Sequence, residues 1–545
     1  MARNAKDTQL IELKDLVKEL RETIQLLNKT LEDVQKEKDD IRQERDNFKE
    51  QVDYLTKKLF GSSSEKGACE IPGQMKLFNE AEAEAAASAD SNTVTDAPEE
   101  TKARRKRSTN EERFKGIPVK KVMLEPDKAE LICSKCGSEL VPIGTEFVRR
   151  ELKIVPAKAT VIEYYSVSYA CKGCTQNGET PVIVKGKDGK AHMMYGMASV
   201  STVAWVIYQK FCNGMPLYRI SQDLDRLGAR ISRATLGNWV IKNSDAFFKP
   251  MYDFFRRKLL ERKFAMADET PVQVLHEPER RAQTKSFMWL FRTGEDGEYP
   301  IILYKYSETR AGDTAVDFLE GFDGYLMCDG YSGYNKVTAA TRLACWAHIR
   351  RYLIDAIPKG KQLDYTQPAV QGVMYTNQLF DLENKIRSKH KTFDAIKEAR
   401  LKQEKPIIEG FLSWLKMQNP VRNSKLDRAV TYIRNRKDFL ANYLEDGRCS
   451  FSNNLSENSI RPFVVGRKGW LFCDTQAGAQ ASAMAYTMVE MAKANNMNVY
   501  YYLTFLFENQ PNDQMSDQEL EQLAPWNENV KAEIQRRIDA QNAEM

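Results

Sequence analysis

Residues 263–275 read Lys-Phe-Ala-Met-Ala-Asp-Glu-Thr-Pro-Val-Gln-Val-Leu, which predicts a β-strand that carries Asp268. The elements predicted next are strands at 286–292 and 301–306, a helix at 311–319, and a fourth strand within 324–330 that ends in Asp329. The order is therefore three strands, one helix, and a fourth strand with a second aspartate.

This succession is typical of ribonuclease H-like folds, in which the first and fourth strands lie side by side. Asp268 and Asp329 would then meet on the sheet, although either one alone would more often be a surface or strand-end residue. Two neighbouring carboxylates are costly unless a cation compensates their charge, and oxygen ligands select Mg²⁺ or Mn²⁺. The strand order therefore predicts a divalent-metal site.

A third acidic ligand is expected on a later helix that packs against the sheet, and Glu457, within residues 452–470, is the candidate. A span of 128 positions separates it from Asp329, which is too long for a loop. Its middle, from about 370 to 444, predicts a helical insertion. The cations close to Glu457, which could hold a scissile strand through its phosphates, are Arg461, Arg467 and Lys468.

Residues 199–247 predict three short helices, at 199–211, 217–227 and 233–246. Ser232 is a good N-cap for the third helix, and Gly228 lies in the turn before it. This arrangement matches a helix-turn-helix, with Arg233, Thr235 and Asn238 as candidate DNA contacts. Three helices packed without nucleic acid fit the sequence about as well, but the neighbouring segments favour DNA.

Two C-x-x-C motifs predict a structural Zn²⁺ site formed by Cys133, Cys136, Cys171 and Cys174. A β-hairpin within 147–169 would carry the second motif. A redox C-x-x-C is the rival interpretation, but it would normally occur once.

Residues 79–100 hold seven acidic and no basic side chains, which predicts a disordered segment. Residues 102–121 then hold nine Lys or Arg, including Arg104 and Arg105. A solvated linker is the usual explanation of such a run, but its place before a zinc module favours a DNA-tracking arm.

Residues 10–59 carry apolar side chains at thirteen of fifteen positions of a heptad seam, without Gly or Pro. Lys38 and Arg45 in that seam favour a two-stranded coil over larger assemblies. A long helix folded back on its own chain is the alternative, but a strict 3.5-residue period favours self-dimerisation.

The 545 residues include 81 Lys or Arg and 76 Asp or Glu, a net charge of +5 that excludes a uniformly basic chain. The sequence has no apolar run long enough to span a membrane and no signal-peptide pattern. It predicts a cytoplasmic or nucleoid-associated protein in which the ten cysteines do not form a disulfide framework.

Several further motifs stand in a fixed order along the chain: Leu59-Phe60-Gly61, Pro216-Leu-Tyr-Arg219, Asp268-x-Thr-Pro271, Asp329-Gly-Tyr-Ser-Gly-Tyr334, Cys345-Trp-Ala-His348, Asn453-Asn454 and Gly466-Arg467-Lys468. With the paired cysteine motifs, they make the chain resemble the transposases of the insertion sequence 66 family over nearly its whole length. The resemblance implies a DDE transposase whose acidic triad is Asp268, Asp329 and Glu457.

Cys345 and His348 look like the C-x-x-H signature of several DDE families. They could bind zinc, orient a phosphate or brace the core; an active-site supporting role for His348 is favoured. The expected chemistry uses two Mg²⁺ or Mn²⁺ ions, first to cleave the element ends and then to join their 3′-OH groups to target DNA. A dimeric zinc-containing DNA-binding regulator and a nuclease of the same fold are the alternatives.

The expected partners are double-stranded DNA, as transposon ends and target, and a second copy of the chain or more through the coiled coil. Small accessory proteins are implied by the resemblance alone, and no membrane is expected.

The expected fold is multidomain α+β. Its divisions are a coiled-coil dimerisation helix (1–66), an acidic then basic linker (67–125), a four-cysteine zinc-ribbon-like module (126–190), a helix-turn-helix region (191–260), the first part of a ribonuclease H-like α/β catalytic core (261–351), a helical insertion (352–449), the second part of the core (450–510) and a C-terminal tail (511–545).

Overall fold

The computed structural model describes residues 159–170, 180, 183–186, 192–194, 197–358 and 364–544. The chain divides into two units, Met1–Pro72 and Gly73–Met545, and all described residues belong to the second. The predicted coiled coil and linker lie outside the described residues, as do Arg104, Arg105, Cys133, Cys136, Cys171 and Cys174.

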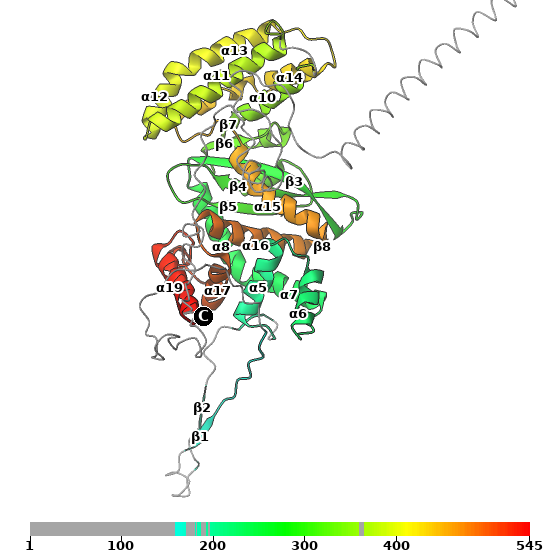
Figure 1. Ribbon diagram of the computed structural model, residues 1–545, viewed down its shortest axis with the longest axis vertical. Coiled ribbons are helices and arrows are strands. Elements are labelled where there is room, and N and C mark those ends of the chain that lie inside the picture. Colours follow the sequence, from blue (N-terminus) through cyan, green and yellow to red (C-terminus); the bar gives the residue numbers. More distant parts are fainter. Residues whose placement is uncertain are drawn as a thin grey trace, which may run out of the picture. The chain divides into compact units, whose positions relative to one another are not determined.

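A mixed sheet forms the centre of the described fold (Figure 1). Its strands are β3 (Phe264–His276), β4 (Lys285–Thr293), β5 (Ile302–Ser307), β6 (Tyr325–Cys328) and β7 (Thr341–Ala344), in the order β5-β4-β3-β6-β7. β3, β4 and β5 are antiparallel neighbours, whereas β6 and β7 run parallel to β3. The predicted adjacency of the first and fourth strands is confirmed, because β3 pairs with β6.

The central strand β3 changes character along its length. Residues 264–267 are fully buried between β4 and β6, as expected for an apolar run in a strand covered on both faces. From Thr270 to Val274 buried and exposed residues alternate, which is the period of a strand with one solvated face. The short strand β8 (Cys473–Thr475) pairs with the far end of β3.

The three helices predicted before the sheet are present as α5 (Val200–Phe211), α6 (Leu217–Arg226) and α7 (Arg233–Asn243). Ser232 caps α7 by accepting the backbone N–H of Thr235, and Gly228 adopts φ +89° in the turn before it. A π-helix, η2 (Ser244–Phe248), and α8 (Lys249–Leu260) follow, and all these helices share one apolar core with the sheet.

Helices occupy the span between β7 and residue 450. They are α10 (Trp346–Asp355), α11 (Pro368–Lys389), α12 (Phe393–Gln403), α13 (Lys405–Met417), α14 (Lys425–Arg434) and the 3₁₀ helices η4 (Lys437–Phe439) and η5 (Asn442–Glu445). Trp346 packs against Phe411 of this group and against Phe451, which follows it in the chain. Asn442 donates to the carbonyl of Arg342 on β7 at 2.9 Å, which attaches the helices to the sheet edge.

The remaining helices complete the core around the sheet. They are α15 (Asn454–Trp470), α16 (Gln476–Ala494), α17 (Val499–Asn509), α18 (Asp517–Glu521) and α19 (Glu528–Glu544). α15 packs on β3 and β4, and α16 lies along β5 (Figure 1).

The segment predicted only as a C-terminal tail, residues 511–545, contributes α18 and α19. Trp526, between them, stacks on Tyr299 at a ring distance of 4.0 Å. Leu520, Val530 and Ile534 are also buried in the main core, so this segment is an integral part of the fold.

Before α5, the strands β1 (Ser168–Ala170) and β2 (Ile183–Lys185) form an antiparallel pair. This pair flanks the second cysteine motif in the sequence. In the part of the chain that the structure describes, we find no helix with the length and apolar character needed to cross a membrane.

Candidate active site

Asp268 and Asp329 occupy equivalent places relative to two neighbouring parallel strands. Met266 of β3 is in register with Met327 of β6, and each aspartate follows two residues later: Asp268 lies within β3, and Asp329 directly follows the last residue of β6. Burial raises the pKa of the Asp268 carboxyl well above its ordinary value, and the charges of Glu269, Asp329 and Glu457 raise this pKa further. The predicted pair is thus an electrostatically coupled group on one sheet.

Glu457 lies in the first turn of α15, and two hydrogen bonds from Asn453 fix the start of that helix. The Asn453 side-chain amide donates to the carbonyl of Ala267, directly before Asp268, at 3.1 Å. The Asn453 backbone N–H donates to the Cys345 sulfur at 3.2 Å. The first bond joins the start of the helix that bears Glu457 to the strand that bears Asp268, and the second joins it to the N-cap of α10.

The Glu457 carboxylate faces two basic residues of α10. His348 Nε2 lies 3.4 Å from Glu457 Oε1, and Arg351 Nη2 lies 3.8 Å from Oε2. Oε1 is buried and has no hydrogen-bond partner among the described residues, so the approach of His348 lacks hydrogen-bond geometry. Burial lowers the pKa of His348.

The donor set fits a hard divalent cation, because all three predicted ligands are carboxylates. A cation would relieve the buried charge of Asp268 and satisfy the unpartnered Oε1 of Glu457. As the side chains stand, no three Asp, Glu, His or Cys residues of the described chain converge closely enough to hold a metal ion. Metal binding would therefore require the carboxylates to draw together.

Residues that sequence reasoning missed hold the loop after Asp329. Arg436, from the end of the helical insertion, donates to the carbonyl of Gly330, and a Cβ on Gly330 would lie 2.0 Å from Arg436 Nη2. A side chain at position 330 would therefore have to displace the Arg436 guanidinium. Glu269, next to Asp268, accepts hydrogen bonds from Arg310 and Tyr334. The one sequence signal for these contacts is the repeated Gly and Tyr of residues 330–334, a pattern that indicates a tightly packed loop.

The predicted DNA contacts fall into two separate groups. On α15, Arg461 and Lys468 are exposed, but Arg467 donates to Thr270 Oγ1 at 3.2 Å and burial lowers its pKa. On α7, Arg233 and Asn238 are exposed, while Thr235 shares a hydrogen bond with Ser232 at 2.9 Å. α7 packs on α5, α6 and α16, whereas α15 packs on the sheet.

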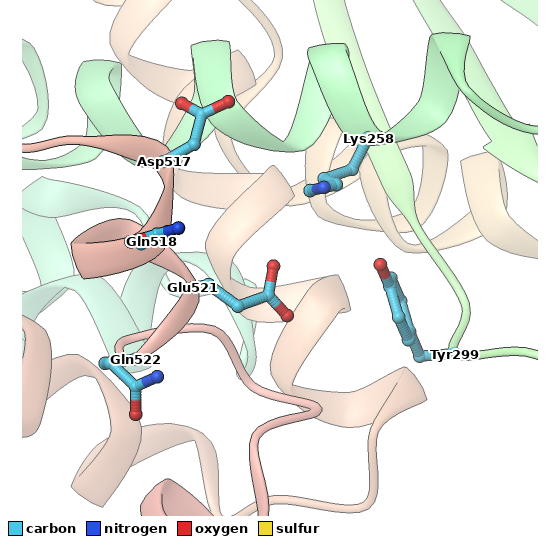
Figure 2. A pocket seen from close by; sticks show the side chains of 6 residues that line it. All are labelled: Lys258, Tyr299, Asp517, Gln518, Glu521 and Gln522. Carbon is cyan, nitrogen blue, oxygen red and sulfur yellow. The ribbon is translucent and has the colours of Figure 1, made fainter.

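A separate cavity of about 530 Å³ lies between α8 and α18 (Figure 2). Its lining residues are Lys258, Tyr299, Asp517, Gln518, Glu521 and Gln522. None of these is a predicted site residue, so the cavity is no part of the carboxylate group.

Comparison with known proteins defines first the class and then the family. The class is that of transposases, because the protein-family model described as "Transposase IS66 family" matches residues 195–481, more than half of the chain. This chain belongs to the IS66 transposase family.

Two further family models match segments before this region. A "zinc-finger binding domain of transposase IS66" matches residues 130–175, which contain all four predicted zinc ligands and support a structural Zn²⁺. "Transposase C of IS166 homeodomain" matches residues 47–119.

The chain is also similar to uncharacterized proteins of Sinorhizobium fredii (strain NBRC 101917 / NGR234). Protein y4qI is 29% identical over 429 residues, which cover 74% of this chain and 75% of that protein. Protein y4jD is 27% identical over 430 residues, which cover 76% and 81% of the two chains.

Proposed function

We propose that this chain is a DDE transposase that binds the ends of an insertion sequence, cleaves them and joins their 3′-OH ends to target DNA. Asp268, Asp329 and Glu457 form its acidic triad. The observation that carries the proposal is the register of β3 and β6, which sets the two aspartates at equivalent positions beside the helix of Glu457.

We also propose a ribonuclease H-like fold for the catalytic core. Three antiparallel strands followed by two strands parallel to the first, in the order β5-β4-β3-β6-β7, support this assignment. The helical insertion enters after β7 and α10, and the chain returns to the sheet as α15. Arg436 of this insertion donates to the carbonyl of Gly330, the residue directly after Asp329.

When bound, a pair of Mg²⁺ or Mn²⁺ ions would activate the attacking water or 3′-OH and stabilise the departing oxygen. The protein holds the DNA with the exposed cations Arg461 and Lys468, whose positions on α15 suit contacts with phosphates. Arg467, tied to Thr270, orients this helix on the sheet. His348 and Arg351 position Glu457 from α10.

Recognition of the element ends falls to the segments before the sheet. α6 and α7 form the proposed helix-turn-helix, with Arg233, Thr235 and Asn238 facing DNA; the basic run with Arg104 and Arg105 adds phosphate contacts. The proposal also includes a structural Zn²⁺ in the four-cysteine module, dimerisation through residues 1–66, and small accessory proteins as partners. The proposed location of the protein is the bacterial cytoplasm, in association with the nucleoid.

The decisive experiment compares wild type with Asp268→Ala on labelled element ends in Mg²⁺. We expect cleavage by wild type only, with DNA binding retained by both. Equal cleavage by the two proteins would refute the triad, and wild-type protein that binds but never cuts would favour a DNA-binding regulator. Pre-cut ends separate a transposase from a nuclease, because only a transposase joins them to target DNA.

A further inference from the structure

The carboxylate of Glu269 is buried directly beside the candidate active site, and its side chain is only 1% exposed. Arg310 donates to Oε1 through Nε at 2.9 Å and through Nη2 at 2.5 Å. Tyr334 donates its hydroxyl to Oε2 at 2.5 Å. Hydrogen bonds to an ionised acceptor are stronger than neutral ones, so these three bonds fix both oxygens.

Both partners of Glu269 also belong to, or contact, the loop that begins at Asp329. The Arg310 guanidinium lies 4.1 Å from the centre of the Tyr331 ring, and the Tyr331 hydroxyl donates to the Arg310 carbonyl. The Tyr331 backbone N–H donates to Asp329 Oδ1 at 2.8 Å. Tyr334 lies in the 3₁₀ turn η3 (Ser332–Lys336), which closes the same loop.

The surroundings keep this chain of contacts in place. Trp289 stands opposite Glu269 in the β3–β4 register and packs edge-on against Tyr334 at a ring distance of 5.6 Å. At the other end of the loop, Arg342 donates to the carbonyl of Asp329 at 3.3 Å. Through its hydrogen bonds, Glu269 therefore ties this loop to the strand of Asp268.

We infer that Glu269 is a positioning residue that holds Asp329 at a set distance from Asp268. β3 then carries Asp268 of the site and, at the next position, Glu269, which holds the loop of Asp329. This inference rests on the proposed function, because it assigns Glu269 a role only if the two aspartates act together.

Glu277, which directly follows the far end of the same strand, provides a matched control. Its side chain is also 1% exposed and binds an arginine, Arg280, at 2.5 Å. It accepts a hydrogen bond from Ser286 at 2.5 Å and another from the Tyr306 hydroxyl. These partners of Glu277, which are Arg280, Ser286 and Tyr306, include no residue of the acidic triad, so its loss removes comparable buried bonds without moving Asp329.

The experiment uses the full-length, Zn²⁺-loaded protein and measures Mn²⁺ binding by electron paramagnetic resonance. Glu269→Gln and Glu277→Gln should lower the unfolding temperature to a similar extent. Only Glu269→Gln should raise the Mn²⁺ concentration for half-saturation, by about 10-fold, the scale seen when supports of metal ligands are removed. Tyr334→Phe, which deletes one hydrogen bond and disturbs folding less, should shift it in the same direction by a smaller factor.

End cleavage is then followed against Mn²⁺ concentration, and high Mn²⁺ should restore the rate of Glu269→Gln. The inference is overturned if Glu269→Gln and Tyr334→Phe bind Mn²⁺ like Glu277→Gln. It is also overturned if Glu269→Gln stays inactive at every Mn²⁺ concentration, because Glu269 would then act as a ligand. Failure of the proposed function is distinct: Asp268→Ala would cleave like wild type.

Discussion

His348 Nε2 lies 3.4 Å from Glu457 Oε1, so α10, the helix that follows β7, contacts Glu457 at the start of α15. This contact joins two elements that are separated by the whole helical insertion. It places the histidine of the C-x-x-H motif beside the proposed triad, while Cys345 accepts a backbone hydrogen bond at the start of the same α15.

We predict that His348→Ala reduces end cleavage by about 10- to 100-fold without abolishing it, since it removes a support of Glu457 rather than a ligand. The measurement is the single-turnover cleavage rate at saturating Mg²⁺. His276→Ala is the control, because that histidine is 73% exposed and pairs with Asp474 away from the triad. A rate equal to wild type would remove His348 from the site.

Lys468→Ala and Arg467→Ala should behave differently, although the two residues are adjacent. Lys468 is exposed, so its loss should weaken DNA binding at all sequences and reduce the salt dependence of binding by about one unit of slope. Arg467 is tied to Thr270, so its loss should mainly slow cleavage. Fluorescence anisotropy at several salt concentrations tests this; identical slopes for Lys468→Ala and wild type would contradict it.

Trp526→Ala should destabilise the protein by about 3 kcal/mol, the scale for removing a large aromatic side chain from a core. Trp526 is 9% exposed and stacks between Tyr299 and Phe254. Urea unfolding provides the measurement, with Met417→Ala, at a position 75% exposed, as the control. If both variants unfold at the same urea concentration, residues 511–545 behave as a dispensable tail.

Glu404→Gln should remove part of the pH dependence of stability. Burial, with the charge of Glu383, raises the pKa of Glu404 from 4.5 to about 8, and its Oε2 accepts the Tyr443 hydroxyl at 2.7 Å. The folded state therefore keeps a proton that the unfolded state loses between about pH 4.5 and 8, so stability falls as pH rises through that window. The free energy of unfolding, measured at several pH values from 5 to 8, should fall less steeply with pH for the variant than for wild type. An equal dependence on pH in the two proteins would refute the assignment.

Much of the fold was predictable because its signals are local. The N-cap at Ser232 and the turn at Gly228 predicted α7, and the apolar run before Asp268 predicted β3. The order of strands and one helix then predicted that β3 and β6 pair, which the structure confirms. The metal ligation, the DNA contacts and the dimer remain predictions.

Other features depend on contacts that no local pattern encodes. Glu269 looks like an ordinary strand residue, and its burial follows from Arg310 and Tyr334, which lie 41 and 65 positions further along the chain. The docking of Trp526 on Tyr299 likewise joins distant segments.

The sequence by itself determined many of the strands and helices and which side chains could carry the chemistry, because periodicity, caps and residue type act over a few positions. Only the tertiary structure decided which buried partners hold those side chains in place. That choice depends on which distant hydrogen-bonding groups can meet once water is excluded, and burial makes each unpaired group costly.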